Sequence, residues 1–314
     1  MLLGHRELSF LAEARAASAA VDAAQHLGVL ERLVRGRADA SAIAHDCELG
    51  ERGTRLLLSA LASVGLVEVE EGGTFQLRRD VAALTDALGN WNQLSEVIRK
   101  DRPLVAAETA RGARSLYRGL VHLLPRLYGN LPGRFAQLVG RDCLRVLDAG
   151  AGAAPWSLAM ARRNVACQVT VVDLPEVLDA ARCAVARAGL DPQFTFVEGD
   201  VFGSDLGSGF DLAIAGNLCH LFDAETNQAL ICTLSATLRP GGRLAVIDLT
   251  LEESLYRPRA TALYALGLTL RTSSGRAYTF SSFAGWMREA GLVSIDRRSL
   301  GRMPALSLIT GLRP

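Results

Sequence analysis

Short apolar runs alternate with helical segments through the second half of this 314-residue chain. The runs that we expect to be strands lie at residues 146–149, 171–173, 194–202, 210–217 and 243–248. Helical segments at 156–163 and 224–238 separate them, and the second is expected to stop at Arg239-Pro240-Gly241-Gly242. This alternation predicts an α/β fold with a doubly wound parallel sheet. Two further runs, at 293–300 and 305–312, predict a terminal antiparallel hairpin.

The first hundred residues follow a different pattern. Apolar positions recur at helical spacing over residues 11–33, with a break at Gly28. Two more helices are expected, at residues 41–47 with Ser41 as the N-cap and at 51–64. Strand-like runs at 66–70 and 74–77 then flank a glycine pair and predict a β-hairpin. Helices followed by a two-stranded wing predict a winged-helix unit.

A glycine turn joins the first predicted strand to its helix and carries the chemistry of a ligand site. Asp148 ends the strand, Gly150 and Gly152 follow it, and Asp173 ends the next strand. Glycines let backbone approach a bound nucleotide, and an acid after the second strand accepts from ribose hydroxyls. Pro155 replaces the third glycine of dinucleotide sites and removes a backbone N–H. A ligand with an ammonium group suits Asp148 better than one with a pyrophosphate, which favours S-adenosylmethionine over NAD.

A third acid supports this choice. Asp200 follows the strand-like run that begins at Phe194, where it can accept from an adenine amino group. Val201 and Phe202 would cover the ring. Together the sequence predicts these cofactor-binding residues: Asp148, Gly150, Gly152, Asp173, Leu174, Asp200, Val201, Phe202 and Asn217.

These motifs occur in an order that resembles a known family. The segments are Leu147 to Gly152, Val172-Asp173-Leu174-Pro175, Glu198 to Phe202, Cys219-His220-Leu221-Phe222 and Leu238 to Arg243. Together they resemble the S-adenosylmethionine-dependent O-methyltransferases of the caffeic acid and acetylserotonin type, which include bacterial enzymes of natural-product biosynthesis. The resemblance covers nearly the whole chain. It implies a class I methyltransferase domain at residues 141–314, a helical linker with pocket helices at 86–140 and a winged-helix dimerisation domain at 1–85.

The resemblance also implies catalytic residues. The family base corresponds to His220, and one of the two acids that orient it corresponds to Asp248. A neutral imidazole can take the proton of a phenolic hydroxyl as its oxygen attacks the sulfonium methyl. The second acid is replaced by Ala277, and the Asp-Trp pair after the histidine by Leu221 and Phe222. A family lysine four residues before the histidine is Gly216. Substrate contacts are expected at Trp91, Tyr117, His122 and Tyr128.

Those departures leave alternatives open. The acceptor atom is oxygen, carbon or nitrogen, or the bound cofactor serves a reaction without methyl transfer. A winged helix also raises the possibility of a DNA-binding regulator. Glu68, Glu70 and Glu71 lie in the wing, however, and would repel phosphate. Dimerisation, which the family implies for this unit, is therefore favoured over nucleic-acid binding.

Composition limits the expected partners, metal content and location of the protein. The formal net charge of +1 gives no bias toward nucleic acid or an anionic membrane. The six cysteines are scattered without metal-ligand spacing, so we expect reduced thiols and no metal site. We find neither a signal-peptide pattern nor an apolar run long enough for a membrane span, and expect a cytoplasmic homodimer.

Overall fold

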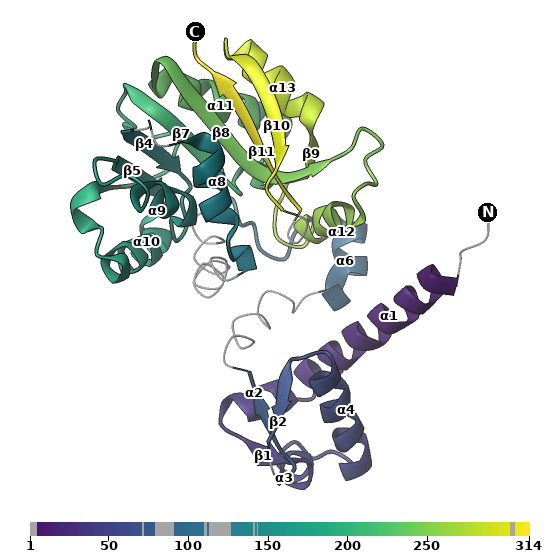
Figure 1. Cartoon of the computed structure of the whole chain (residues 1–314). Coiled ribbons are helices and arrows are strands. Elements are labelled where there is room, and N and C mark those ends of the chain that lie inside the picture. The colour runs from purple at the N-terminus through teal and green to yellow at the C-terminus, as the bar shows by residue number, and fades with distance from the viewer. Residues whose placement is uncertain are drawn as a thin grey trace. The chain divides into compact units, whose positions relative to one another are not determined.

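The computed structural model describes residues 5–70, 72–78, 91–109, 112, 127–140, 142, 144–301 and 305–314. The chain divides into two compact units, Met1–Asn92 and Gln93–Pro314, each with its own core (Figure 1). A domain boundary at residue 85 stays a prediction, because residues 79–90 lie outside the described residues. A separate linker over 86–140 stays a prediction, because much of that range lies outside the described residues. Within the described residues, no helix combines the length and apolar character needed to cross a bilayer.

A mixed sheet forms the centre of the larger unit (Figure 1). Its strands are β4 (Arg145–Ala149), β5 (Gln168–Asp173), β6 (Phe194–Glu198), β7 (Phe210–Gly216), β8 (Leu238–Leu251), β10 (Val293–Ser299) and β11 (Leu306–Leu312). They lie in the order β10-β11-β8-β7-β4-β5-β6, and β9 (Tyr278–Thr279) pairs with β8. Neighbours from β8 to β6 are parallel, whereas β11 is antiparallel to β8 and β10. The predicted parallel sheet and terminal hairpin are confirmed.

Helices cover both faces of this sheet. Alternate residues of β7 contribute to two separate buried clusters, because successive strand side chains point to opposite faces. The cluster on one face includes residues of α8 (Leu131–Val139), α9 (Pro155–Ala161) and α10 (Pro175–Ala188). The cluster on the other includes residues of α11 (Ala224–Thr237) and α13 (Phe280–Glu289). The remaining α-helices described in this unit are α6 (Leu94–Lys100) and α12 (Arg259–Leu268).

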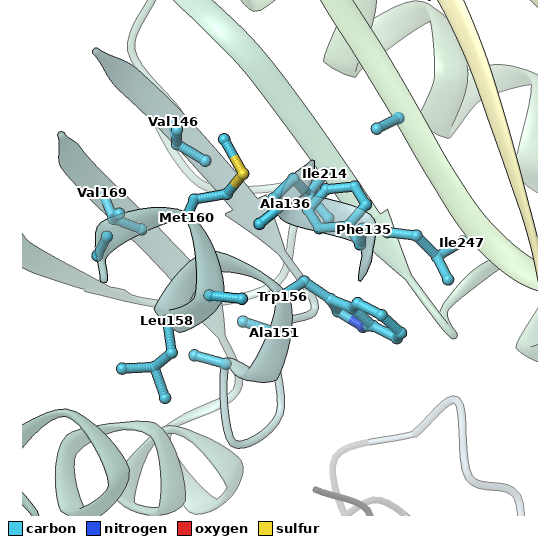
Figure 2. Packing of buried hydrophobic residues seen from close by; sticks show 14 of the residues in the cluster. Phe135, Ala136, Val146, Ala151, Trp156, Leu158, Met160, Val169, Ile214 and Ile247 are labelled. Atoms are coloured by element: carbon cyan, nitrogen blue, oxygen red, sulfur yellow. The ribbon is translucent and has the colours of Figure 1, made fainter. Parts of the chain in front are cut away.

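Trp156, in α9, is the largest fully buried side chain of the described residues and packs with Phe135 in the cluster that includes residues of α8, α9 and α10 (Figure 2). Its ring lies 5.2 Å from that of Tyr128 and 5.7 Å from that of Phe135, measured between centroids. A Cβ atom on Gly216, at the end of β7, would lie 2.4 Å from Trp156 Cδ1. The indole therefore excludes any side chain at residue 216, including the lysine that the family places there.

One expectation for this unit was wrong in detail. Residues 239–242 do not separate the helix from the strand, because β8 begins at Leu238 and continues through them with a shifted register against β7.

The smaller unit packs helices against a short sheet. Its helices are α1 (His5–His26), α2 (Val29–Val34), α3 (Ala40–Asp46) and α4 (Glu51–Ser63). The predicted hairpin is confirmed as β2 (Val67–Val69) and β3 (Thr74–Leu77). A third strand, β1 (Ala38–Asp39), pairs with β3 and was not predicted. Two residues carry too little periodicity to be recognised as a strand.

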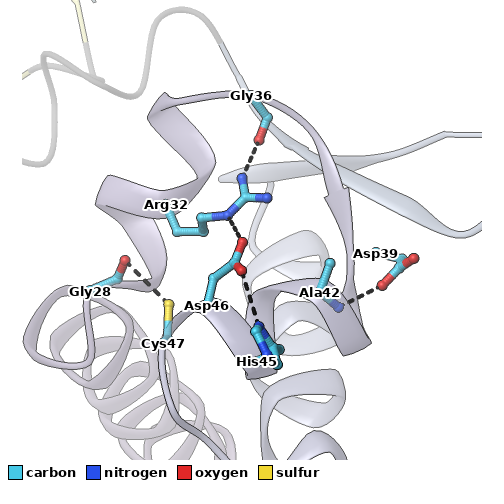
Figure 3. A network of polar contacts seen from close by, with 8 residues as sticks. All are labelled: Gly28, Arg32, Gly36, Asp39, Ala42, His45, Asp46 and Cys47. Carbon is cyan, nitrogen blue, oxygen red and sulfur yellow. Dashed lines mark hydrogen bonds and ion pairs between the residues drawn. The ribbon is translucent and has the colours of Figure 1, made fainter.

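A polar network holds α2 to α3 in this unit (Figure 3). Arg32 Nε donates to Asp46 Oδ2 at 2.5 Å, and its Nη1 donates to the Gly36 carbonyl at 3.2 Å. The N-cap of α3 is Asp39, which accepts from the Ala42 N–H at 2.8 Å, so the prediction of Ser41 was wrong. Ser41 instead donates to Glu51, at the start of α4. An acid two residues before the expected cap accepts from a backbone N–H of the first helical turn.

Candidate active site

A pocket of about 950 Å³, partly open to solvent, lies at the carboxyl ends of β4 to β7. Four connections line it, each leaving the end of a parallel strand: 150–153 after β4, 173–174 after β5, 199–202 after β6 and 216–218 after β7. This edge is where open α/β sheets bind their ligands. Of the predicted cofactor residues, those lining the pocket are Gly150, Gly152, Asp173, Leu174, Asp200, Val201, Phe202 and Asn217.

The turn after β4 takes its shape from left-handed residues. Gly150 has φ 63° and Gly152 has φ 58°, a region that favours glycine. A Cβ on Gly150 would lie 2.7 Å from a Leu218 methyl carbon, so the turn also passes close to the β7 connection. Pro155 occupies the first position of α9, where a missing N–H costs nothing.

Asp173 fixes this turn to β5 and has acceptor capacity left over. Its Oδ2 accepts from the Gly152 N–H and its Oδ1 from the Leu174 N–H, both at 2.7 Å. Burial raises the pKa of Asp173 to about 6, against the effect of these two hydrogen bonds. Each carboxylate oxygen keeps a lone pair for a ligand hydroxyl.

The third acid, Asp200, orders the connection after β6. Its Oδ1 accepts from the Phe202 N–H at 2.8 Å. The ring of Phe202 meets Phe222 edge-on at 5.7 Å and remains 42% exposed. A partly exposed aromatic ring beside the pocket is available to cover a flat ligand group.

The charged side chains of the pocket are all acidic and therefore acceptors. Its charged residues are Glu108, Asp173 and Asp200, and the described lining includes no lysine, arginine or histidine. Two buried side-chain oxygens there, Asn217 Oδ1 and Glu108 Oε2, have no hydrogen-bond partner among the described residues. A pyrophosphate would meet carboxylates and no cation, whereas S-adenosylmethionine carries an ammonium, a sulfonium, ribose hydroxyls and an amino group. The pocket therefore fits S-adenosylmethionine.

Glu108 was not singled out from the sequence. Its Oε1 accepts from the Ser273 N–H at 2.8 Å, which leaves Oε2 at the pocket wall. Glu108 follows no strand and belongs to no motif, so no local signal marks it. Only the tertiary contact with the segment after α12 places it here.

Asp148 lies behind the pocket wall and not in its lining. It is fully buried, and its Oδ2 accepts from Ser157 Oγ at 2.5 Å. Burial raises its pKa to about 7, and the neighbouring Asp173 charge adds to this rise. Asp148 Oδ2 therefore supports the turn through α9, whereas its Oδ1 has no hydrogen-bond partner among the described residues. A contact between Asp148 and the ligand's ammonium stays a prediction.

His220 and Asp248 form a buried pair beside the pocket. His220 Nδ1 lies 2.8 Å from Asp248 Oδ1, and the His220 backbone N–H donates to Asp248 Oδ2 at 3.1 Å. Asp248 also accepts from the Leu249 N–H, so its carboxylate is held rigidly. The other ring nitrogen, Nε2, lies 2.9 Å from the hydroxyl of Tyr264 in α12. No sequence pattern predicted this contact.

The residues that depart from the family surround this pair. Ala277, at the position of the second acid, is buried, while Leu221 and Phe222 line the pocket. Residues 219–221 form a single 3₁₀ turn. Burial raises the pKa of the Cys219 thiol well above its ordinary value, which suits a packing role.

The structure describes two of the four predicted substrate residues. Tyr128 lines the pocket, against Trp156. Trp91 belongs to the smaller unit, in the 3₁₀ turn Trp91–Gln93 that spans the boundary. Tyr117 and His122 lie outside the described residues.

Known proteins resemble the chain in sequence and fold. Residues 138–293 match the O-methyltransferase domain family. The chain is 25% identical over 319 residues to the 3-hydroxy-5-methyl-1-naphthoate 3-O-methyltransferase of Streptomyces sahachiroi, covering 93% of this chain and 90% of that protein. It is 24% identical over 283 residues to the tetracenomycin polyketide synthesis 8-O-methyl transferase of Streptomyces glaucescens, covering 81% and 83%. The structure of human N-acetylserotonin methyltransferase with S-adenosylmethionine superposes with a TM-score of 0.72 at 23% identity, covering 100% and 98%.

Proposed function

The chain belongs to the S-adenosylmethionine-dependent O-methyltransferases of the caffeic acid and acetylserotonin type, and we propose that its acceptor is a hydroxyl group on a small aromatic or polyketide-like natural product. The observation that carries this proposal is that a cofactor pocket with acidic side chains lies next to the hydrogen-bonded pair of His220 and Asp248. The naphthoate and tetracenomycin enzymes to which the chain is similar support an aromatic acceptor.

The proposed roles follow from the position of each side chain. Asp173 accepts from the ribose hydroxyls and Asp200 from the adenine amino group, with Phe202 over the ring. Asn217 Oδ1 and Glu108 Oε2 supply acceptors for the ammonium end of the ligand. S-adenosylmethionine, when bound, supplies a methyl group on a positively charged sulfur.

The His220–Asp248 pair would remove the proton of the acceptor. Both Asp248 oxygens accept backbone N–H bonds, from His220 and Leu249, so the Asp248 side chain acts as an acceptor and His220 Nδ1 carries the hydrogen between them. That tautomer leaves Nε2 as the basic nitrogen. The pair can then hold a proton while Asp248 stabilises the resulting imidazolium.

We further propose that the smaller unit is a winged-helix domain that forms a homodimer. Its helices expose apolar side chains, including Leu11 in α1 and Leu56 in α4. Arg37, which precedes β1, pairs with Glu70, and Arg78, which follows β3, pairs with Glu68, which disfavours DNA binding. Sedimentation velocity should give twice the chain mass of 33.5 kDa. A monomer at micromolar concentration would contradict the dimer.

Methyl transfer can be followed with carbon-13 in the methyl group of S-adenosylmethionine and with naphthol and naphthylamine acceptors. We expect the label on oxygen, with one S-adenosylhomocysteine released per methyl group. Asp173→Asn should raise the dissociation constant for S-adenosylhomocysteine at least about tenfold, because hydrogen bonds to charged groups contribute about 1.5–3 kcal/mol. Asp191→Asn, an exposed acid outside the pocket, is the matched control.

The same assay separates the alternatives. Label on nitrogen or on a ring carbon would contradict O-methylation but would still show that the protein transfers a methyl group. Tight S-adenosylhomocysteine binding without release of any product would indicate a reaction that uses the cofactor's charge alone.

A further inference from the structure

The basic nitrogen of His220 already has a hydrogen-bond partner within the protein. Its Nε2 accepts a hydrogen bond at 2.9 Å from the Tyr264 hydroxyl, since Nδ1 carries the ring hydrogen toward Asp248. His220 is 5% exposed, whereas Tyr264 is only partly buried. An acceptor hydroxyl therefore reaches Nε2 by displacing Tyr264, or it reaches Tyr264 instead.

Tyr264 is held in place from several directions. Its ring meets the His220 ring edge-on at 5.3 Å, and the Arg271 guanidinium carbon lies 4.7 Å from its centroid on the ring face. It also packs against the buried cluster that contains Trp156. Displacing the ring would break all of these contacts, so displacement is the more costly of the two routes.

The chain after α12 connects Tyr264 to the cofactor pocket. Ala107 donates its N–H to the Arg271 carbonyl at 2.8 Å, and the Ser273 N–H donates to Glu108 Oε1 at 2.8 Å. Ala107 and Glu108 both line the pocket. The segment that carries Arg271 is therefore bonded directly to the pocket wall.

We propose that Tyr264 is a catalytic residue that receives the acceptor's proton and passes its own proton to His220. This step rests on the proposed hydroxyl methylation. The acceptor O–H bond breaks as a new O–H bond forms at Tyr264, while the original Tyr264 proton moves to His220 Nε2. The acceptor oxygen takes the methyl group with its freed electron pair, and the bond between that methyl carbon and sulfur breaks. Tyr264 ends neutral, and the positive imidazolium lies against Asp248.

The electrostatics of Tyr264 suit this role. Burial raises the pKa of its hydroxyl, and the nearby Asp248 charge raises it further, whereas Arg271 lowers it. The hydroxyl is therefore protonated at neutral pH and donates to His220. Its oxygen lone pairs remain to accept from a substrate hydroxyl. Negative charge that develops on the ring during the transfer is stabilised by Arg271.

Tyr264→Phe removes the transferred proton and leaves the ring. We expect kcat to fall about tenfold to a hundredfold, within the range typical of a lost proton-transfer group. Tyr256→Phe, an exposed tyrosine of the preceding loop, should leave kcat unchanged. In mixtures of light and heavy water, kcat should show a two-proton dependence in the native enzyme and a one-proton dependence in Tyr264→Phe. An unchanged or increased kcat in Tyr264→Phe would show that Tyr264 only covers the base, and would overturn the proposal.

A binding readout separates this step from the proposed function. With nitrogen-15 histidine, the His220 Nε2 signal of the S-adenosylhomocysteine complex should shift in Tyr264→Phe, because its hydrogen bond is lost. Addition of a naphthol acceptor should perturb the Tyr264 hydroxyl carbon signal and leave Nε2 bonded. A naphthol that perturbs Nε2 equally in both proteins contradicts the relay even if no methyl transfer occurs. Perturbation of Tyr264 without any O-methyl product would contradict the proposed function alone.

Discussion

Replacing His220 by alanine should lower kcat by about a hundredfold to ten-thousandfold, the range expected for the loss of a general base. The dissociation constant for S-adenosylhomocysteine should stay within about twofold, because His220 does not line the cofactor pocket. Steady-state kinetics with the naphthol acceptor and titration calorimetry measure the two quantities separately. The effect should exceed that of Tyr264→Phe, since without the imidazole neither residue can hold the proton.

The variant is expected to fold, which makes the kinetic result interpretable. Asp248 would lose the imidazole donor but keep the backbone N–H groups of residue 220 and Leu249. Its buried carboxylate therefore remains hydrogen-bonded. Added imidazole should restore part of kcat in His220→Ala and none in Tyr264→Phe. Turnover that is unchanged in His220→Ala would exclude the histidine as the base.

The ligand edge of the sheet was largely predictable from the sequence, because its signals are local. The strands β5, β6 and β7 end in an acid or a glycine, and Gly150 directly follows β4. The carboxyl ends of these parallel strands meet at one edge of the sheet. Asp173 and Asp200 could therefore be placed without knowing any long-range contact. Asp148 shows the limit of this reasoning, since the spacing fixes its strand position but not which neighbour its carboxyl group faces. Ser157, one helical turn into α9, decides that.

The catalytic surroundings were less predictable, because they depend on contacts between distant segments. Tyr264 meets His220 across 44 positions of sequence, and Glu108 meets Ser273 across 165. No periodic pattern in the sequence indicates either contact. Gly216 shows the same limit in reverse: a missing lysine was visible in the sequence, but the Trp156 indole that excludes it was not.

Replacing Asp148 by asparagine should remove a pH dependence from the stability of the larger unit. The pKa of Asp148 is raised from 3.8 in the unfolded chain to about 7 in the fold, chiefly by burial. Between these values the folded state binds a proton that the unfolded state has released, so the free energy of unfolding falls as pH rises. At about 1.36 kcal/mol per pH unit, the native chain should lose about 2–3 kcal/mol from this group between pH 5 and 8.

The difference in unfolding free energy between native chain and Asp148→Asn isolates this group. Native-state hydrogen exchange of β4, measured without cofactor, reports that quantity for the larger unit. The unfolding free energy of the native chain, relative to that of Asp148→Asn, should fall steadily up to about pH 7. Above that pH it should stay constant, because Asp148 is charged in both the folded and the unfolded chain. Asparagine preserves the acceptor for Ser157 Oγ, and the cost of its buried amide group is the same at every pH. For Asp173→Asn, the same difference in unfolding free energy should also fall as pH rises. It should do so over a narrower pH range, because the pKa of Asp173 rises only to about 6. A difference that does not change between pH 5 and 8 would mean that Asp148 stays ionised in the fold, and its carboxylate would then be available to pair with the cofactor's ammonium.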